Sequence, residues 1–396
     1  MSVVPDTMRN FIVGQPSESL IPRQVLDTAF QRTLLFNTDP YIYQYASSQG
    51  PLPLRKQLAR YLSSTGLYPS QISEKHLCIS FGNSSGIAMA ISSLSKPGDR
   101  VVVEDPTYFL IGKILRDAGL DMSTCTVDPH KGLDIDMFES LVSSIKPRLV
   151  YLNPIHHNPT GSVMPLSTRE RILHLSKEHD FIILSDEPYV MLSFDHSTSS
   201  EVFSSLSLTA SRLFPDDSFK NLVCFGSFSK ILTPGLRCGW MAAHPDVISI
   251  ISQHGALASG GGPPSFISET IRQIIANNEL DMHVSFLRTE LRDRATAMCA
   301  AVHEGFGDAV TFHYPQGGYF VYVSVVDEDF DSVDFQRFMD NHTDPCIQIL
   351  ASPRCSVTGT CKANSMRLAF SFYSPDEIRD NVRLLADAYH RYRQLR

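Results

Sequence analysis

The chain has 396 residues, 43% of them apolar, which is enough to bury two hydrophobic cores, a large one and a smaller one. Its formal net charge of −8 comes from 34 basic and 42 acidic residues spread along the sequence. Without a basic block to follow a phosphate backbone, nucleic acid is not an expected partner.

The first ten residues lack the apolar run of a signal peptide, and no stretch approaches the roughly 20 apolar residues of a membrane span. We therefore expect a protein without a membrane partner. The eight cysteines are scattered without the Cys-x-x-Cys spacing of a zinc site or the pattern of a disulfide framework. Reduced thiols, no bound metal and a cytoplasmic location are the corresponding expectations.

From about residue 46 onward, short β-branched runs that are apolar on both faces alternate with helical stretches, which is typical of strands in a parallel sheet. The clearest runs lie at 77–81, 100–104, 149–152, 181–184 and 222–225, with another at 238–243. This pattern predicts an α/β fold with a mostly parallel sheet.

After about residue 285 the pattern changes to a charged helix at 288–303, a strand at 318–325 and a closing helix at 375–393. This order indicates a second domain of α+β type. We therefore predict a large domain over 46–284 and a small domain over 285–396, with the N-terminal segment 1–45 lying against the small domain or along the cleft.

Polar or turn-forming clusters follow five of the predicted strands, at residues 82–86, 105–108, 153–161, 185–189 and 226–230. In open α/β sheets ligands bind beyond the carboxyl ends of the strands. These clusters, although distant in sequence, should converge on one crevice.

The last cluster, Gly-Ser-Phe-Ser-Lys, places Lys230 just after a buried strand, with Arg237 seven residues further on. A free lysine is almost fully protonated at neutral pH, but in a buried cationic site it becomes a Schiff-base former. Ser227, Ser229 and Arg237 could supply donors for a phosphate. Taken alone, a surface lysine at a strand end would be the better interpretation.

Ser227, Lys230, Gly235, Arg237 and Gly239 stand in the order Ser-x-x-Lys and Gly-x-Arg-x-Gly. This pattern closely resembles the class I and II aminotransferases, enzymes of fold type I that use pyridoxal 5′-phosphate (PLP). The resemblance implies a three-layer α/β large domain. It also implies that Lys230 forms a Schiff base with PLP and that Ser227 and Arg237 hold the cofactor phosphate.

Asp186 ends an apolar strand, where an ionised carboxylate is costly unless it meets a cation such as a protonated pyridine nitrogen. A helix N-cap is an equally good interpretation of Asp186 from the residues alone. The motifs around Asn158 (Asn-Pro-x-Gly) and Tyr189 (Asp-x-x-Tyr) also match the family. The resemblance implies that Asp186 pairs with the pyridine nitrogen and that Asn158 and Tyr189 donate to the cofactor's phenolic oxygen.

By the same resemblance, Tyr108 stacks on the cofactor ring, and Ser84 and Ser85 face the phosphate at the N-terminus of a helix over 87–94. Tyr45 matches the tyrosine that reaches the phosphate of the neighbouring subunit, which implies a homodimer with a shared active site. A core tyrosine is the plain alternative for both Tyr45 and Tyr108.

The resemblance also assigns Arg367 to the substrate α-carboxylate, with Gly14 and Asn158 in the same pocket. We expect His156 and His157 to be packing residues, because neither has a partner at metal-ligand spacing, and we expect 260–264 to be a loop. The sequence departs from the family at 352–357, where relatives commonly carry Pro-Gly-x-x-Phe.

The predicted function is a PLP-dependent aminotransferase that moves an amino group between an L-amino acid and a 2-oxo acid, with Lys230, Asp186 and Tyr189 as catalytic residues. The cofactor alone does not fix the reaction. A carbon–sulfur lyase or a cyclising or eliminating PLP enzyme is the first alternative. A regulatory module of the same fold is disfavoured by the acidic balance and by the lack of a helix-turn-helix extension.

Overall fold

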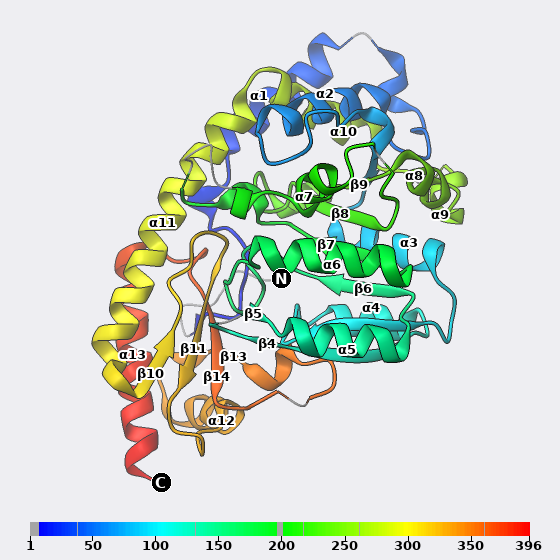
Figure 1. Ribbon diagram of the computed structural model, residues 1–396. Helices are drawn as coiled ribbons and strands as arrows, with labels where there is room; N and C mark the ends of the chain where they lie inside the picture. Colours follow the sequence, from blue (N-terminus) through cyan, green and yellow to red (C-terminus); the bar gives the residue numbers. More distant parts are fainter. Residues whose placement is uncertain are drawn as a thin grey trace.

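An eight-stranded sheet forms the centre of the computed structural model, which describes residues 8–37, 39–130, 132–195, 201–216, 218–260, 262–359 and 361–396 (Figure 1). The strands, in spatial order, are β2 (Leu77–Ser80), β9 (Gly239–Ala243), β8 (Leu222–Ser227), β7 (Ile182–Asp186), β6 (Leu149–Leu152), β3 (Arg100–Asp105), β4 (Asp121–Asp128) and β5 (Gly132–Leu133). The expected α/β architecture is confirmed.

Neighbouring strands from β8 through β7, β6 and β3 to β4 are parallel, as predicted. The strand predicted at 238–243 is β9, which runs antiparallel to both β8 and β2, so the sheet is mixed but mostly parallel. Residues 228–238, which join β8 to β9, are fewer than the dozen or more that a parallel crossover requires. β2 runs in the same direction as β8, since both are antiparallel to β9.

Helices cover both faces of this sheet and make the fold three-layered. One face packs against α3 (Asn83–Leu94), α4 (Ile111–Asp117) and α8 (Pro245–Ser252). The other packs against α5 (Ile135–Ile145), α6 (Leu166–His179) and α7 (Leu206–Leu213). Successive side chains of a strand point to opposite faces of the sheet. Val101 and Val103 of β3 therefore pack with α3, α4 and α8, and Val102 packs with α5, α6 and α7.

A second, four-stranded antiparallel sheet has the order β10 (Val310–Phe312), β11 (Phe320–Val325), β14 (Ser365–Ala369) and β13 (Leu350–Ala351). The long helices α11 (Glu279–Phe306) and α13 (Pro375–Gln394) pack side by side along it, with α12 (Ser332–His342) next to α13 (Figure 1). The predicted helix at 288–303 is thus longer at both ends, and the predicted strand and closing helix are present. The division at 284/285 falls inside α11 and stays a prediction.

The N-terminal segment joins the two parts. β1 (Met8–Asn10) pairs in parallel with β12 (Cys346–Gln348), and α1 (Arg23–Gln31) and α2 (Leu52–Ser64) pack on α10 (Ser265–Ala276). Helix α9 (Gly255–Ala258) follows α8. Single turns of 3-10 or π type complete the element order: 18–20, 32–36, 40–43, 74–76, 190–192, 201–203, 234–236, 307–309 and 352–355.

In the part of the chain that the structure describes, no helix is long and apolar enough to cross a membrane. The predictions made on residues 1–7, and on Gly261 within the loop at 260–264, lie outside the described residues.

Close packing next to the end of β8 makes Gly226 a sensitive position. A Cβ atom there would lie 2.1 Å from ring atoms of Trp240, a buried side chain of β9. We expect Gly226→Ala to lower the free energy of unfolding by about 1–3 kcal/mol or more through overpacking. Gly235→Ala is the matched control, because its Cβ would meet no atom within 4 Å. Urea unfolding of both variants tests this expectation, and equal stability of the two would contradict it.

Candidate functional site

The carboxyl ends of β2, β3, β6, β7 and β8 border one cleft with a volume of about 380 Å³. Segments far apart in sequence meet there, as the cluster positions predicted. The predicted site residues that line the cleft are Gly14, Ser84, Tyr108, Asn158, Asp186, Tyr189, Ser227, Lys230, Arg237 and Arg367. Ser85 and Tyr45 are not among its lining residues.

Lys230 follows β8 directly, and its ammonium group donates to the Gly14 carbonyl oxygen at 2.6 Å. The Nζ atom also lies 5.3 Å from the ring centre of Tyr319 and 5.9 Å from that of Tyr189. Burial, aided by the positive charge of Arg367, lowers the pKa of Lys230 to about 8 even though Asp186 acts in the opposite direction. A useful fraction of the amine is therefore unprotonated near neutral pH and can act as a nucleophile or base.

The carboxylate of Asp186, the last residue of β7, is buried and accepts a hydrogen bond at each oxygen. Tyr151 donates its hydroxyl to Oδ2 and Asn83 donates its amide to Oδ1, both at 2.7 Å. Burial raises the pKa of Asp186, while these two donors and the charge of Lys230 work against that rise. Neither Tyr151 nor Asn83 stands out in the sequence, because their contacts with Asp186 cross between elements that only the sheet order places next to each other.

An anion-binding corner lies at the N-terminus of α3. Gly82, just before the helix, has φ +89, and a Cβ there would lie 2.8 Å from Nη2 of Arg237. Only glycine therefore lets the guanidinium approach the helix terminus this closely. Arg237 donates to the carbonyl oxygens of Pro234 and Phe81, at 3.0 and 3.3 Å. Helix N-termini and arginine forks both favour phosphate, so this corner fits a phosphate group.

The serines of this corner differ in their contacts. The Ser227 hydroxyl accepts from the backbone amide of Ser229 at 3.1 Å, and both residues line the cleft. Ser84 lines it as well, whereas Ser85 donates its hydroxyl to the Gly82 carbonyl oxygen at 3.0 Å. A cofactor contact by Ser85 stays a prediction.

At the other end of the cleft, Arg367 of β14 is buried and its guanidinium lies 4.0 Å from the ring centre of Phe320. It donates to Asn158 Oδ1 at 2.8 Å and to the Ile12 carbonyl oxygen at 2.5 Å, while its Nε atom has no hydrogen-bond partner among the described residues. The guanidinium thus has donor capacity left for a carboxylate. Because the Asn158 oxygen is engaged by Arg367, the amide nitrogen of Asn158 stays available as a donor.

Asn153 connects the asparagine turn to the end of β7. Its side chain donates to the Asp186 carbonyl oxygen at 2.6 Å and accepts from the Asn158 backbone amide at 2.8 Å. Its own backbone amide donates to the buried carboxylate of Glu104 at 2.7 Å. Asn153 therefore fixes the position of Asn158 relative to Asp186, a role that its place in a polar cluster did not disclose.

The two histidines before Asn158 pack behind the cleft. The ring of His156 is within 2.8 Å of the Ser193 hydroxyl, and burial lowers its pKa to about 3, which keeps it neutral. His157 contacts Thr160 at 2.8 Å and lies 3.4 Å from Glu104. Both side chains are buried, and their role as packing residues stays a prediction. The described residues contain no group of three or more His, Cys, Asp or Glu side chains that could hold a metal ion.

The two tyrosines expected near the cofactor lie in different places. Tyr108 lines the cleft, where burial raises its pKa and a hydrogen bond with Ser84 partly offsets that rise. Tyr45 is 85% exposed and lies beside Gly260, where an added Cβ would be 3.2 Å from the tyrosine ring. Within one chain, Tyr45 does not reach the cleft.

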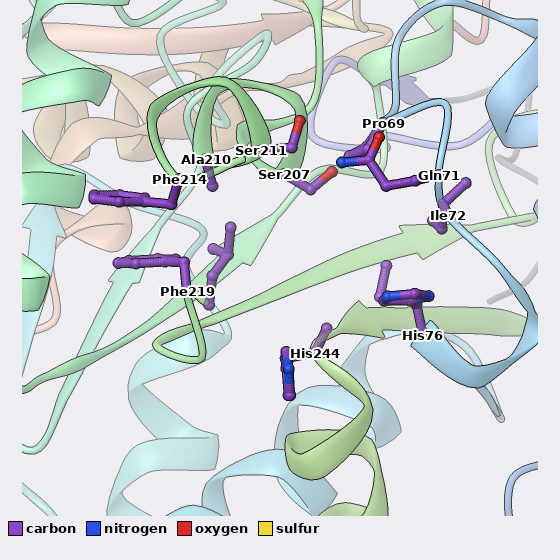
Figure 2. A pocket seen from close by; sticks show the side chains of 13 residues that line it. Pro69, Gln71, Ile72, His76, Ser207, Ala210, Ser211, Phe214, Phe219 and His244 are labelled. Atoms are coloured by element: carbon purple, nitrogen blue, oxygen red, sulfur yellow. The ribbon is translucent and has the colours of Figure 1, made fainter. Parts of the chain in front are cut away.

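A second pocket lies at the other end of the strands of the large sheet, beside the start of β8 and the end of β9 (Figure 2). The stacked rings of Phe214 and Phe219, 4.8 Å apart, form one end of it, and His76 and His244 lie across from Ser207. Its lining, among the described residues, contains no lysine and no arginine. This second pocket therefore offers neither an amine for an aldehyde nor an arginine or lysine for a phosphate, whereas the cleft at the strand carboxyl ends offers both.

The cleft residues fit PLP. They provide a partly deprotonated amine for the aldehyde at Lys230, a phosphate corner beside Arg237, and a buried carboxylate at Asp186 for a cationic ring nitrogen. Arg367 remains for a substrate carboxylate.

Comparison with known proteins agrees with this geometry. Residues 10–380 match the family model described as aminotransferase class I and II. The chain is 26% identical over 384 residues to aromatic-amino-acid aminotransferase 1 of Thermococcus litoralis, covering 94% of this chain and 86% of that protein. It is 25% identical over 316 residues to 2-aminoadipate transaminase of Thermus thermophilus, covering 80% and 75%.

Among solved structures, the alpha-aminoadipate aminotransferase of Thermus thermophilus superimposes with a TM-score of 0.86 at 22% identity, covering 99% of this chain and 94% of that one. The kynurenine aminotransferase of Pyrococcus horikoshii gives a TM-score of 0.85 at 24% identity, covering 97% and 91%. These likenesses establish the fold.

The lowered pKa of Lys230 has a consequence for stability in the cofactor-free protein. Its pKa is about 8 when folded against 10.5 for an unperturbed lysine, so between these values the unfolded chain binds a proton that the folded protein does not. The contribution of Lys230 to the free energy of unfolding therefore becomes more favourable as the pH rises from about 8 to 10.5. Relative to Lys230→Met, the wild type should gain about 1–2 kcal/mol between about pH 7.5 and pH 9.5 in urea unfolding. A difference that does not change with pH would show that Lys230 titrates normally.

Proposed function

The chain belongs to the class I and II aminotransferases, and we propose that Lys230 holds PLP in this enzyme and carries the proton between the substrate α-carbon and the cofactor. The observation that supports this proposal is the meeting of Lys230, Asp186, Arg237 and Arg367 in one cleft. When bound, PLP supplies the electron sink for the bond broken at the α-carbon.

Further side chains serve the cofactor in this proposal. Arg237, Ser227 and the N-terminus of α3 with Ser84 and Ser85 bind the phosphate, where positive charge and backbone amides gather. The Asp186 carboxylate pairs with the ring nitrogen, held in place by its bonds from Tyr151 and Asn83. Tyr108 stacks on the ring.

Asn158 and Tyr189 donate to the phenolic oxygen of the cofactor. The side-chain oxygen of Asn158 accepts a hydrogen bond from Arg367, which leaves its amide nitrogen as the donor. Burial raises the pKa of Tyr189 well above its ordinary value, so its phenol stays a donor at neutral pH.

The substrate α-carboxylate binds Arg367, whose fork fixes its orientation as well as its affinity. The segment 12–14 borders this site, since the Ile12 carbonyl contacts Arg367 and the Gly14 carbonyl contacts Lys230. As a free amine Lys230 has a pKa of about 8, near the operating pH, and so could both take and return a proton at the substrate α-carbon when PLP is bound. The substrates are an L-amino acid and a 2-oxo acid; the relatives named above include enzymes for both aromatic and acidic side chains, so the family alone does not fix the side chain.

A homodimer is part of this proposal, with Tyr45 reaching the phosphate in the neighbouring subunit. Its support is an exposed apolar surface around Tyr45, which is typical of an interface. The large side chains of this surface are Leu34, Leu35, Phe36, Tyr41, Tyr43 and Tyr45, each more than half exposed. We also propose a cytoplasmic location, which the eight free cysteines support.

The visible spectrum of the purified holoenzyme tests the function. Adding amino acids without an acceptor should replace a band near about 420 nm by one near about 330 nm, with release of a 2-oxo acid. Lys230→Ala should lose the original band and at least about 100-fold in kcat. Lys220→Ala is the control, because Lys220 is an exposed lysine before β8 that pairs with Asp246.

Other products would point to another reaction. Ammonia, a thiol or a cyclic product formed without amination of the cofactor would establish the lyase or cyclase alternative. A protein with no Lys230-dependent band would contradict the PLP assignment.

A further inference from the structure

We propose that this aminotransferase takes amino acids with uncharged, apolar side chains, aromatic or long aliphatic, in preference to dicarboxylic amino acids. The inference rests on the proposed function. It is drawn from the charges that the cleft offers once the cofactor and the α-carboxylate have been bound.

Each cationic side chain that lines the cleft is needed to bind the cofactor or the α-carboxylate, which every amino acid substrate requires. Of the described residues that line it, three are cationic: Lys230, Arg237 and Arg367. Lys230 is required at the cofactor aldehyde, and Arg237 lies against the phosphate corner at Gly82. Arg367, at the opposite end, is left for one carboxylate. A second carboxylate on the substrate would therefore find no cation among these residues. Arg354, whose charge acts on Arg367, is exposed and does not line the cleft.

Arg367 itself cannot be shared between two carboxylates. Arg367 is 1% exposed, and its guanidinium lies 4.0 Å from the ring centre of Phe320 and 5.8 Å from that of Phe109. Two of its nitrogens already donate to Asn158 and Ile12. The remaining donor capacity suits the α-carboxylate alone.

Several of the side chains that line the cleft are apolar. Ile12 and Val13 come from the N-terminal segment, Phe109 and Leu110 follow Tyr108, and Phe320 comes from β11. Gln15 adds a neutral polar group. Leu110 is 44% exposed, which places an apolar side chain at the solvent-facing border of the cleft. A substrate side chain that extends from the α-carbon thus meets apolar surface, as in pockets that select by burial.

Placing an unpaired carboxylate on this surface is strongly unfavourable, whereas an apolar side chain gains from burial. We expect phenylalanine, leucine and methionine to aminate the bound cofactor at least about 100-fold faster, at equal low concentration, than aspartate, glutamate or 2-aminoadipate. Stopped-flow absorbance of the holoenzyme, mixed with each amino acid in turn, measures this ratio.

The outcomes separate the inference from the function on which it rests. Dicarboxylic amino acids that react as fast as phenylalanine, or faster, would overturn the side-chain inference and leave transamination intact. If no amino acid of either class aminates the cofactor, the proposed function fails and the inference fails with it.

A charge introduced at the wall tests the physical reason. Leu110→Arg places a cation at a position that is already partly in water, and Leu110→Gln is a control of similar size without charge. Leu110→Arg should raise the rate with glutamate or 2-aminoadipate about 10-fold relative to Leu110→Gln. It should not raise the rate with leucine. Equal rates for the two variants with the dicarboxylic substrates would show that missing positive charge is not what excludes them.

Discussion

A buried carboxylate at the end of a central strand is the constraint on which this site depends. Asp186 lies where β7 meets the cleft, and the protein meets its two oxygens with neutral donors, Tyr151 and Asn83. Neutral donors satisfy the hydrogen bonds but not the charge, so the site favours a further cation. We propose that a protonated ring nitrogen supplies that charge and that the carboxylate in turn keeps the ring cationic. Cofactor chemistry and the burial of Asp186 thus stabilise each other.

The sheet topology brings the partners of this carboxylate together. β6 and β8 flank β7 in parallel, so Tyr151 and the turn that carries Lys230 lie on either side of Asp186. The reversal into β9 then brings Arg237 back towards Gly82 at the start of α3. Burial and the positive charges of Arg367 and Arg237 lower the pKa of Lys230 to about 8. The placement of positive charge at both ends of the cleft therefore also prepares the lysine as a base.

Much of this arrangement could be predicted from the sequence, since strand ends are marked by abrupt polar clusters after apolar runs. The three-layer fold and the grouping of Lys230, Asp186, Asn158 and Arg367 followed from those clusters and from the family motifs. Contacts that cross between neighbouring elements could not be predicted, because they depend on sheet order. Tyr151 is an ordinary residue of an apolar run until β6 is placed beside β7. The direction of β9 could not be predicted for a related reason, since apolar content does not distinguish a strand that returns through a short turn from one that follows a crossover.

Reduction of the holoenzyme with borohydride, followed by peptide mass mapping, tests the central claim that the cleft holds PLP through Lys230. The account predicts a phosphopyridoxyl group on the peptide that contains Lys230, and its absence when the enzyme is first incubated with an amino acid that removes the cofactor aldehyde. A modified peptide elsewhere in the chain, or label on Lys230 that a reactive amino acid does not displace, would contradict it.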